Sequence, residues 1–165
     1  MRILGIDPGI AIVGWGVVDY AAGRFHAVAY DAITTPSTEP TEQRLLTIDK
    51  KVTALIEAAK PDAMAVEELF WNTNQKTGIV VAEARGVILL CARQHGIPIF
   101  EYTPLQVKQA VVGYGRAEKK QVITMVTTLL GLPKPPKPDD TADALALAMC
   151  HGHVGASVLS KYYKM

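Results

Sequence analysis

The chain has 165 residues, of which 49% are hydrophobic and 20% charged, and its net charge is +1 at neutral pH. This composition is typical of a folded globular protein and excludes disordered and fibrous classes. We expect one domain over residues 1–153 and a C-terminal tail over 154–165. The two cysteines lie in apolar surroundings without metal-ligand spacing, which indicates reduced, packed thiols. No apolar run approaches the roughly 18 residues that cross a bilayer, so we expect a cytoplasmic protein without membrane contact.

The first nineteen residues predict a β-hairpin that ends its first strand on a carboxylate. An apolar run, Ile3–Ile6, leads to Asp7, a Pro8-Gly9 turn and a second apolar run, Ile12–Val18. A carboxylate at the end of a buried strand ionises at a cost unless cations, hydrogen bonds or water compensate. Aspartate also favours turns, so Asp7 is either a turn residue or one member of a site.

A third strand, a helix and a fourth strand follow. The segment Arg24–Ile33 reads as a strand in which side chains alternate, with Phe25, Ala27, Ala29 and Asp31 against His26, Val28 and Tyr30. A helix is expected from Thr41, as its N-cap, to Lys60. The short apolar segment Ala63–Val66 reads as a buried strand that ends in Glu67. The sequence therefore places a second carboxylate at a strand end.

The second half is mainly helical. We expect a helix over Lys76–His95, a strand over Ile97–Tyr102, helices over Thr103–Val112 and Ala117–Leu130, and an extended connection over Leu132–Pro138. These elements predict an α/β fold with a five-stranded mixed sheet flanked by helices. If the strands that end in Asp7 and Glu67 are parallel neighbours, both carboxylates emerge at the edge of the sheet where α/β proteins place ligands.

The last helix is expected over Asp139–His151, with Asp139 as its N-cap and Asp140 in its first turn. Asp140 and Asp143 have i, i+3 spacing and share a face, but Asp139 and Asp143 share one too at i, i+4. Capping favours Asp140 as the functional partner. Three aspartates in a first turn also fit compensation of the helix dipole alone. His151 and His153, spaced H-x-H, could be metal ligands, but they fall at or beyond the end of this helix, so we expect a surface role for both.

Positive charge is concentrated in one segment. Between Tyr102 and Pro138 there are six lysines and arginines against a single glutamate, while the flanking regions are acidic. Such asymmetry is typical of a nucleic-acid contact, although a solvated lysine-rich face gives the same pattern.

Carboxylates gathered at one site repel one another unless divalent cations compensate. All-oxygen ligation favours Mg²⁺, with Mn²⁺ as a substitute, because zinc sites usually recruit histidine or cysteine. Two such ions can activate water and stabilise the leaving oxygen during phosphodiester cleavage. The pattern thus predicts two Mg²⁺ ions per site.

Four motifs occur in the order GIDPG, AVEELF, QVKQAVVGYGRAEKKQV and DDTADALALA. In these motifs the chain closely resembles the RuvC Holliday junction endonucleases, over nearly its whole length up to His153. The resemblance implies a ribonuclease H-like fold, a homodimer, and Mg²⁺-dependent resolution of four-way DNA junctions by paired symmetric nicks, in recombination and repair. A branch-migration helicase complex is an implied partner.

The resemblance also implies roles for individual residues. The metal-binding catalytic set is Asp7, Glu67, Asp140 and Asp143. Phe70 matches an aromatic residue that stacks on bases near the junction centre, with Trp71 beside it as the alternative. The DNA-contacting basic residues are Lys108 and Lys119, and the charged segment adds Arg116 and Lys120.

Other functions remain open at this point. GIDPG is also similar to the phosphate-binding turn of actin-like kinases and ATPases, but those proteins need two such domains. A ribonuclease H-like enzyme for RNA or RNA:DNA hybrids shares the fold and metals, and a non-catalytic junction-binding module would use its carboxylates for structure only.

For the dimer we expect the interface on the helix over Lys76–His95. Its small residues Ala82, Ala84 and Gly86 allow close approach, and further apolar surface comes from Val87, Leu89, Leu90 and Cys91. The same helix could instead pack entirely on its own sheet.

Overall fold

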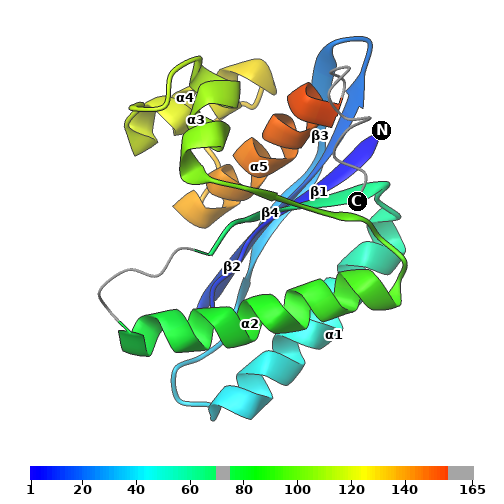
Figure 1. Ribbon diagram of the computed structural model, residues 1–165, viewed down its shortest axis with the longest axis vertical. Helices are drawn as coiled ribbons and strands as arrows, with labels where there is room; N and C mark the ends of the chain where they lie inside the picture. The colour runs from blue at the N-terminus through cyan, green and yellow to red at the C-terminus, as the bar shows by residue number, and fades with distance from the viewer. Residues whose placement is uncertain (70–74, 156–165) are drawn as a thin grey trace.

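The computed structural model describes residues 1–69 and 75–155 (Figure 1). Its strands are β1 (Arg2–Asp7), β2 (Ile12–Ala21), β3 (Arg24–Thr34), β4 (Ala63–Glu67) and β5 (Ile99–Tyr102). Its helices are α1 (Thr41–Ala59), α2 (Gln75–Gln94), α3 (Pro104–Val112), α4 (Lys119–Leu129) and α5 (Asp139–Gly155). None of these helices is long and apolar enough to span a membrane.

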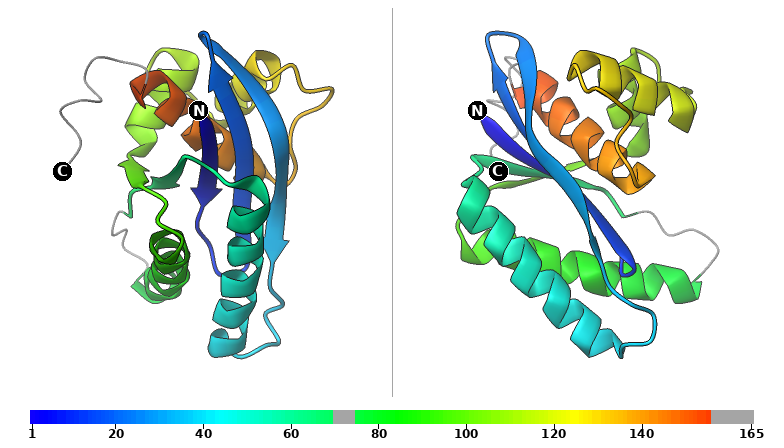
Figure 2. Two further views of the ribbon diagram at one scale, coloured as in Figure 1. Left: turned by 90° about the vertical axis from the view of Figure 1, so that its right-hand side faces the viewer. Right: turned by 180° about the vertical axis from the view of Figure 1, so that it is seen from behind.

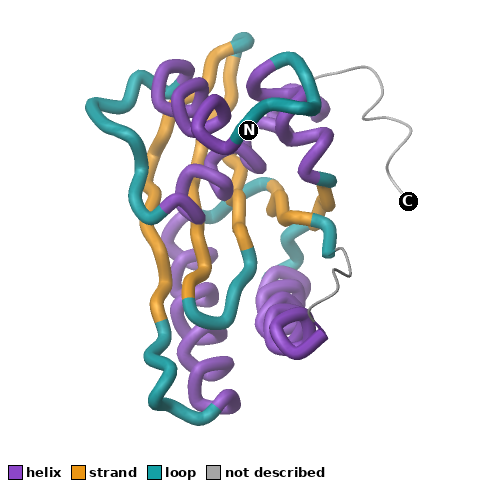
Figure 3. The backbone as a smooth tube through the Cα atoms, turned by 90° about the vertical axis from the view of Figure 1, so that its left-hand side faces the viewer, coloured by secondary structure: helices purple, strands orange, loops and turns teal. Residues whose placement is uncertain are grey.

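The strands form one mixed sheet in the order β3-β2-β1-β4-β5, visible as the adjacent extended segments of Figure 3. The first three strands are antiparallel neighbours, while β4 pairs in parallel with β1 and β5 pairs in parallel with β4. This is the predicted α/β arrangement. The parallel pairing of β1 with β4 satisfies the condition under which Asp7 and Glu67 emerge at the same edge.

Helices cover both faces of the sheet, with α1 and α2 on one side and α3, α4 and α5 on the other (Figure 2). The alternation of side chains along β1 divides it between two cores. Leu4 and Ile6 pack among residues of α1 and α2, whereas Ile3 packs among residues of α3, α4 and α5. Because side chains alternate along a strand, Gly5 and Asp7 lie on the same face as Ile3.

The helix α5 is buried along most of its length, as expected for a helix that is apolar almost all round. It packs across β1 and β2, where two glycines allow it to approach the backbone of the sheet. A Cβ atom on Gly5 would lie 1.9 Å from the carbonyl oxygen of Ala144, and one on Gly14 would lie 2.0 Å from that of Asp140. Any side chain at either position would displace the helix.

Three predicted helix starts are wrong by one or two residues. Helix α1 is capped by Pro40, whose carbonyl accepts from the backbone N–H of Arg44 at 3.1 Å, so Thr41 is already helical. Helix α4 starts at Lys119, because Glu118 forms a capping box that ends the preceding loop. Asp139 is the first residue of α5 and not its N-cap.

The prediction that side chains alternate without interruption along β3 is also wrong. Val17 pairs with Ala29 and Val18 with Ala27, so Val28 is an extra residue that forms a β-bulge. Val28 is 45% exposed as a result. The bulge exchanges the faces of the strand on either side of it.

Candidate active site

Two carboxylates lie side by side at the ends of β1 and β4. Ile6 pairs with Val66 in the parallel ladder, so Asp7 and Glu67 are the next residues of two neighbouring strands. On β4, Ala65 packs in the core beneath α5, which places Glu67, two residues later, on that same face. The side chains of Asp7 and Glu67 therefore both project toward α5, at the same edge of the sheet.

The first turn of α5 brings the other two carboxylates to this edge. Gly14 of β2 pairs directly with Asp7, and its missing side chain leaves room for the backbone of Asp140. Asp143 follows one turn further along the same helix. The packing of α5 against two strands thus assembles carboxylates from three elements.

These carboxylates act strongly on one another. Burial, followed by the negative charges of Glu67, Asp143 and Asp140, raises the pKa of Asp7 to about 8. Burial is also the main reason that the pKa of Glu67 is raised, and the charge of Asp143 adds to it. The pKa of Asp143 is raised by burial as well. Burial and like charges that together raise the pKa of several neighbouring carboxylates are typical of a site that takes up positive charge.

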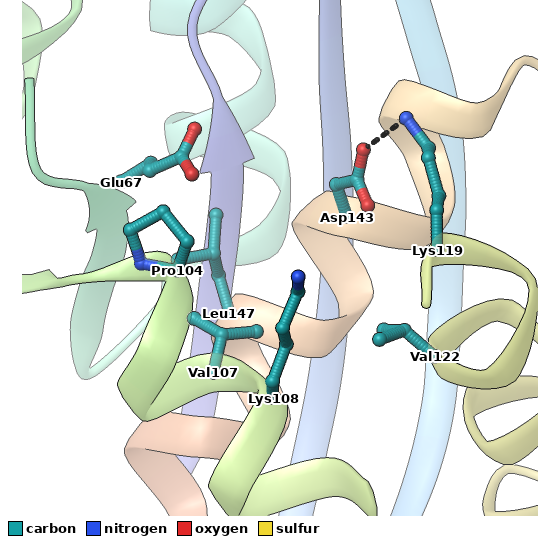
Figure 4. A pocket seen from close by; sticks show the side chains of 8 residues that line it. All are labelled: Glu67, Pro104, Val107, Lys108, Lys119, Val122, Asp143 and Leu147. Atoms are coloured by element: carbon teal, nitrogen blue, oxygen red, sulfur yellow. Dashed lines mark ion pairs between the residues drawn. The ribbon is translucent and has the colours of Figure 1, made fainter. Parts of the chain in front are cut away.

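Two lysines face the carboxylates across a pocket of about 220 Å³ (Figure 4). The ammonium group of Lys119, the first residue of α4, lies 2.8 Å from Oδ2 of Asp143 and opposes the rise in its pKa. Lys108 reaches the pocket from α3, whose first turn is fixed by a capping box on Thr103. The lining residues are Glu67, Pro104, Val107, Lys108, Lys119, Val122, Asp143 and Leu147.

The donor chemistry of this pocket fits a hard divalent cation. Its acidic groups, Glu67 and Asp143, offer only oxygen, which Mg²⁺ and Mn²⁺ prefer. Burial, together with neighbouring negative charges, raises the pKa of both groups, so a bound cation would favour their charged forms. Within residues 1–69 and 75–155, no three acidic, histidine or cysteine side chains already surround a common point at ligand distance.

Comparison with known proteins identifies the family. The sequence profile described as crossover junction endodeoxyribonuclease RuvC matches residues 3–151. The crossover junction endodeoxyribonuclease RuvC of Alkaliphilus oremlandii is 59% identical over 155 residues, which are 94% of either chain. The chain belongs to the RuvC family.

Solved RuvC structures show the same fold. The RuvC of Thermus thermophilus superposes with a TM-score of 0.86 and 37% identity, covering 94% of this chain and 95% of that one. A second T. thermophilus RuvC structure, in complex with a Holliday junction substrate, also has a TM-score of 0.86, with 34% identity and the same coverage. The fold is therefore ribonuclease H-like, as the resemblance predicted.

Asp139 and Asp140, the two candidates for the third carboxylate, have different surroundings. Asp140 contributes to the raised pKa of Asp7. Asp139 instead accepts from the ammonium group of Lys137 at 3.1 Å, and its side chain is 43% exposed. These surroundings favour Asp140, although the capping argument for it does not hold, because Asp139 is the first residue of the helix and not its N-cap.

The remaining candidate residues divide between exposed positions and positions outside the described chain. Arg116 and Lys120 are exposed, and both are close in sequence to the pocket-lining Lys119. Phe70 and Trp71 lie outside the described residues.

The predicted surface role of His151 is wrong. Helix α5 continues to Gly155, so His151 lies within it and is only 4% exposed. Its Nδ1 is 2.7 Å from the hydroxyl of Tyr102, its ring lies 4.3 Å from that of Phe100, and burial lowers its pKa to about 4. This contact ties β5 to α5, and nothing in the local sequence indicates it. His153 is exposed as predicted.

Proposed function

We propose that this protein resolves four-way DNA junctions by paired symmetric nicks, using phosphodiester hydrolysis assisted by two Mg²⁺ ions. The observation that carries the proposal is the pocket in which Glu67 of β4 and Asp143 of α5 face two lysines, with Asp7 of β1 near enough that, besides burial, the charges of both carboxylates raise its pKa. The T. thermophilus RuvC that was solved with a Holliday junction substrate supports the choice of DNA.

Asp7, Glu67, Asp140 and Asp143 are the residues that would hold Mg²⁺, with Mn²⁺ as a substitute. Bound there, the metal would supply Lewis acidity and an activated water. Before binding, Lys119 compensates part of the negative charge through its contact with Asp143. When the DNA backbone enters, a phosphate competes with that carboxylate for the ammonium group, so Lys119 is suited to hold the phosphate next to the carboxylates.

Lys108 occupies the opposite part of the pocket and points toward the region between Glu67 and Asp143 in Figure 4. Its charge would orient a phosphate from the α3 side. The apolar side chains of Val107, Val122 and Leu147 form the wall beneath both lysines. Arg116 and Lys120 extend the positive surface along the duplex, and Phe70 is proposed to stack on an unpaired base at the junction centre.

A homodimer completes the proposal, because two equivalent strands are cut at symmetric positions. The outer face of α2 is the proposed interface. Ile79 and Leu90 are 52% and 55% exposed there, and Gly86 has nothing within 4 Å of a Cβ placed on it. Two residues expected in this interface, Ala84 and Cys91, are instead fully buried in the protomer's own core. The contact with a branch-migration helicase complex stays a prediction of family membership.

A cleavage assay tests the proposal. The protein is incubated with Mg²⁺ and a labelled four-way junction, with linear duplex and RNA:DNA hybrid as controls. We expect paired nicks in the junction alone, and cutting of the hybrid instead would favour a ribonuclease H-like activity.

Four isosteric variants identify the reacting groups. Each removes one ligand charge and keeps the shape of the side chain, so cleavage should be lost while junction binding remains. The variants are Asp7→Asn, Glu67→Gln, Asp140→Asn and Asp143→Asn, and Asp139→Asn is the matched control. Normal cutting by all four would contradict the mechanism, and junction binding without any cutting by the wild type would favour a binding module.

A further inference from the structure

Arg85 on α2 contacts the backbone of Glu67 from the face of the sheet opposite the pocket. Its Nε donates to the carbonyl oxygen of Glu67 at 3.2 Å. Its Nη2 donates to Oε2 of Glu101 at 2.5 Å. The guanidinium group thus joins the ends of two neighbouring strands, β4 and β5, to helix α2.

The location of this contact matters because Glu67 is the last residue of β4, and β4 has only five residues. Strand ends fray unless something fixes them. On one side the backbone N–H of Glu68 bonds to the carbonyl of Tyr102 at 2.9 Å. Arg85, whose side chain is only 13% exposed, supplies the second attachment.

Arg85 acts on Glu67 through the backbone and not through its charge. The charges that shift the pKa of the Glu67 carboxyl group are those of Asp143 and Lys119. The Glu67 side chain points toward α5, and Glu101 precedes Tyr102, whose side chain packs in the core beneath α5, so Glu101 points to the α2 face. Arg85 and the Glu67 carboxylate therefore lie on opposite faces of the sheet.

We propose that Arg85 is a positioning residue that holds the Glu67 carboxylate in place for metal binding by fixing the carbonyl of the same residue. The inference rests on the proposed function, because it assigns Glu67 to the metal site. Residues that orient a ligand from behind typically change metal affinity by about 10- to 100-fold when they are removed. We expect a loss of about tenfold, because Arg85 acts through the strand and not on the carboxylate itself.

The chain contains a matched control. Arg2, at the other end of β1, also combines an ion pair with a backbone contact: its Nε and Nη2 lie 2.9 Å from the two carboxylate oxygens of Asp19, and its Nη1 donates to the carbonyl of Ala59 at 3.1 Å. Arg2→Gln therefore removes the same chemistry far from the pocket.

The test measures Mn²⁺ affinity of the full-length protein without DNA, from the metal-dependent rise in melting temperature. Cleavage as a function of Mg²⁺ and junction affinity in EDTA are measured on the same variants. Arg85→Gln should bind Mn²⁺ about tenfold more weakly and need about tenfold more Mg²⁺ for cleavage, with junction affinity unchanged. Arg2→Gln should lose stability and keep its Mn²⁺ affinity.

The direction of the change decides the question. Removing a positive charge should by itself tighten cation binding, so a role through charge alone predicts a higher Mn²⁺ affinity in Arg85→Gln. Equal or tighter Mn²⁺ binding by Arg85→Gln would overturn the positioning role. If that variant does not fold, Arg85→Lys keeps the positive charge but not the planar fork that reaches both Glu67 and Glu101, and it should also weaken Mn²⁺ binding. Unchanged affinity in Arg85→Lys would overturn the role as well.

Glu67→Gln separates this inference from the function on which it rests. Wild-type Mn²⁺ affinity in Glu67→Gln would overturn the metal site and the positioning role together. Weak binding by Glu67→Gln beside normal binding by Arg85→Gln would overturn the positioning role alone.

Discussion

Asp7→Asn should stabilise the metal-free protein while it abolishes cleavage. A carboxyl group whose pKa is raised by folding binds its proton more tightly in the folded state. Its contribution to stability is complete below the ordinary pKa of 3.8 and is lost as the pH rises to about 8. Relative to a neutral side chain, Asp7 lowers the free energy of unfolding by up to about 5 kcal/mol at pH 8, and by about 2 kcal/mol at pH 5, where folding must protonate it. An asparagine has no such cost, so its stabilising effect should increase with pH.

The assay is urea denaturation in EDTA at pH 5 and pH 8, for the wild type and for Asp7→Asn. Asp19→Asn is the matched control, since hydrogen bonds from Arg2 lower the pKa of Asp19 and its replacement should destabilise the protein at pH 8. Mg²⁺ should restore stability to the wild type at pH 8, by about 2.7 kcal/mol at a hundredfold excess over its dissociation constant, and should do less for Asp7→Asn. A destabilised Asp7→Asn at pH 8, or an effect of the same size at both pH values, would refute the electrostatic reasoning.

Three further predictions concern DNA, assembly and packing. Lys108→Ala and Lys119→Ala should each reduce the slope of log affinity against log salt by about 0.9, and slopes that stay at the wild-type value would place the DNA elsewhere. Gly86→Arg should shift light-scattering mass from about two chains toward one and uncouple the two nicks; a dimeric variant that makes paired cuts would exclude α2. Gly14→Ala should lower unfolding free energy by about 1–3 kcal/mol and reduce cleavage, because its Cβ meets the backbone of Asp140. The control Gly86→Ala should gain up to about 1 kcal/mol, and equal behaviour of the two alanine variants would contradict the packing argument.

Local patterns were sufficient to predict the strand ends. The apolar run before Asp7 and the Pro8-Gly9 turn after it place Asp7 at the end of β1. The short apolar run before Glu67 likewise places Glu67 at the end of β4. Helical spacing placed Asp140 and Asp143 on one face, and the family resemblance then assigned both to the metal-binding set. The prediction that Asp7 and Glu67 share one edge assumed that β1 and β4 are parallel neighbours. The sequence does not show this pairing, and the structure does.

Features that depend on three-dimensional contacts could not be predicted. The burial of His151 follows from a helix longer than expected, and its bond to Tyr102 joins residues 49 positions apart. Arg85 looks like an ordinary basic residue of an exposed helix, since its contacts with Glu67 and Glu101 leave no local pattern. The bulge at Val28 likewise depends on pairing with β2.

The position of the carboxylates depends on glycines as much as on the acidic residues. Gly14 and Gly16 alternate on β2, with Gly5 opposite Gly16 on β1, so all three lie on the face that α5 covers. Glycine weakens a strand interior, and its use in neighbouring strands usually marks a close backbone approach. Here that approach brings the first turn of α5 against the strand end that carries Asp7. A change that fills this face would therefore separate the acidic residues without altering any of them.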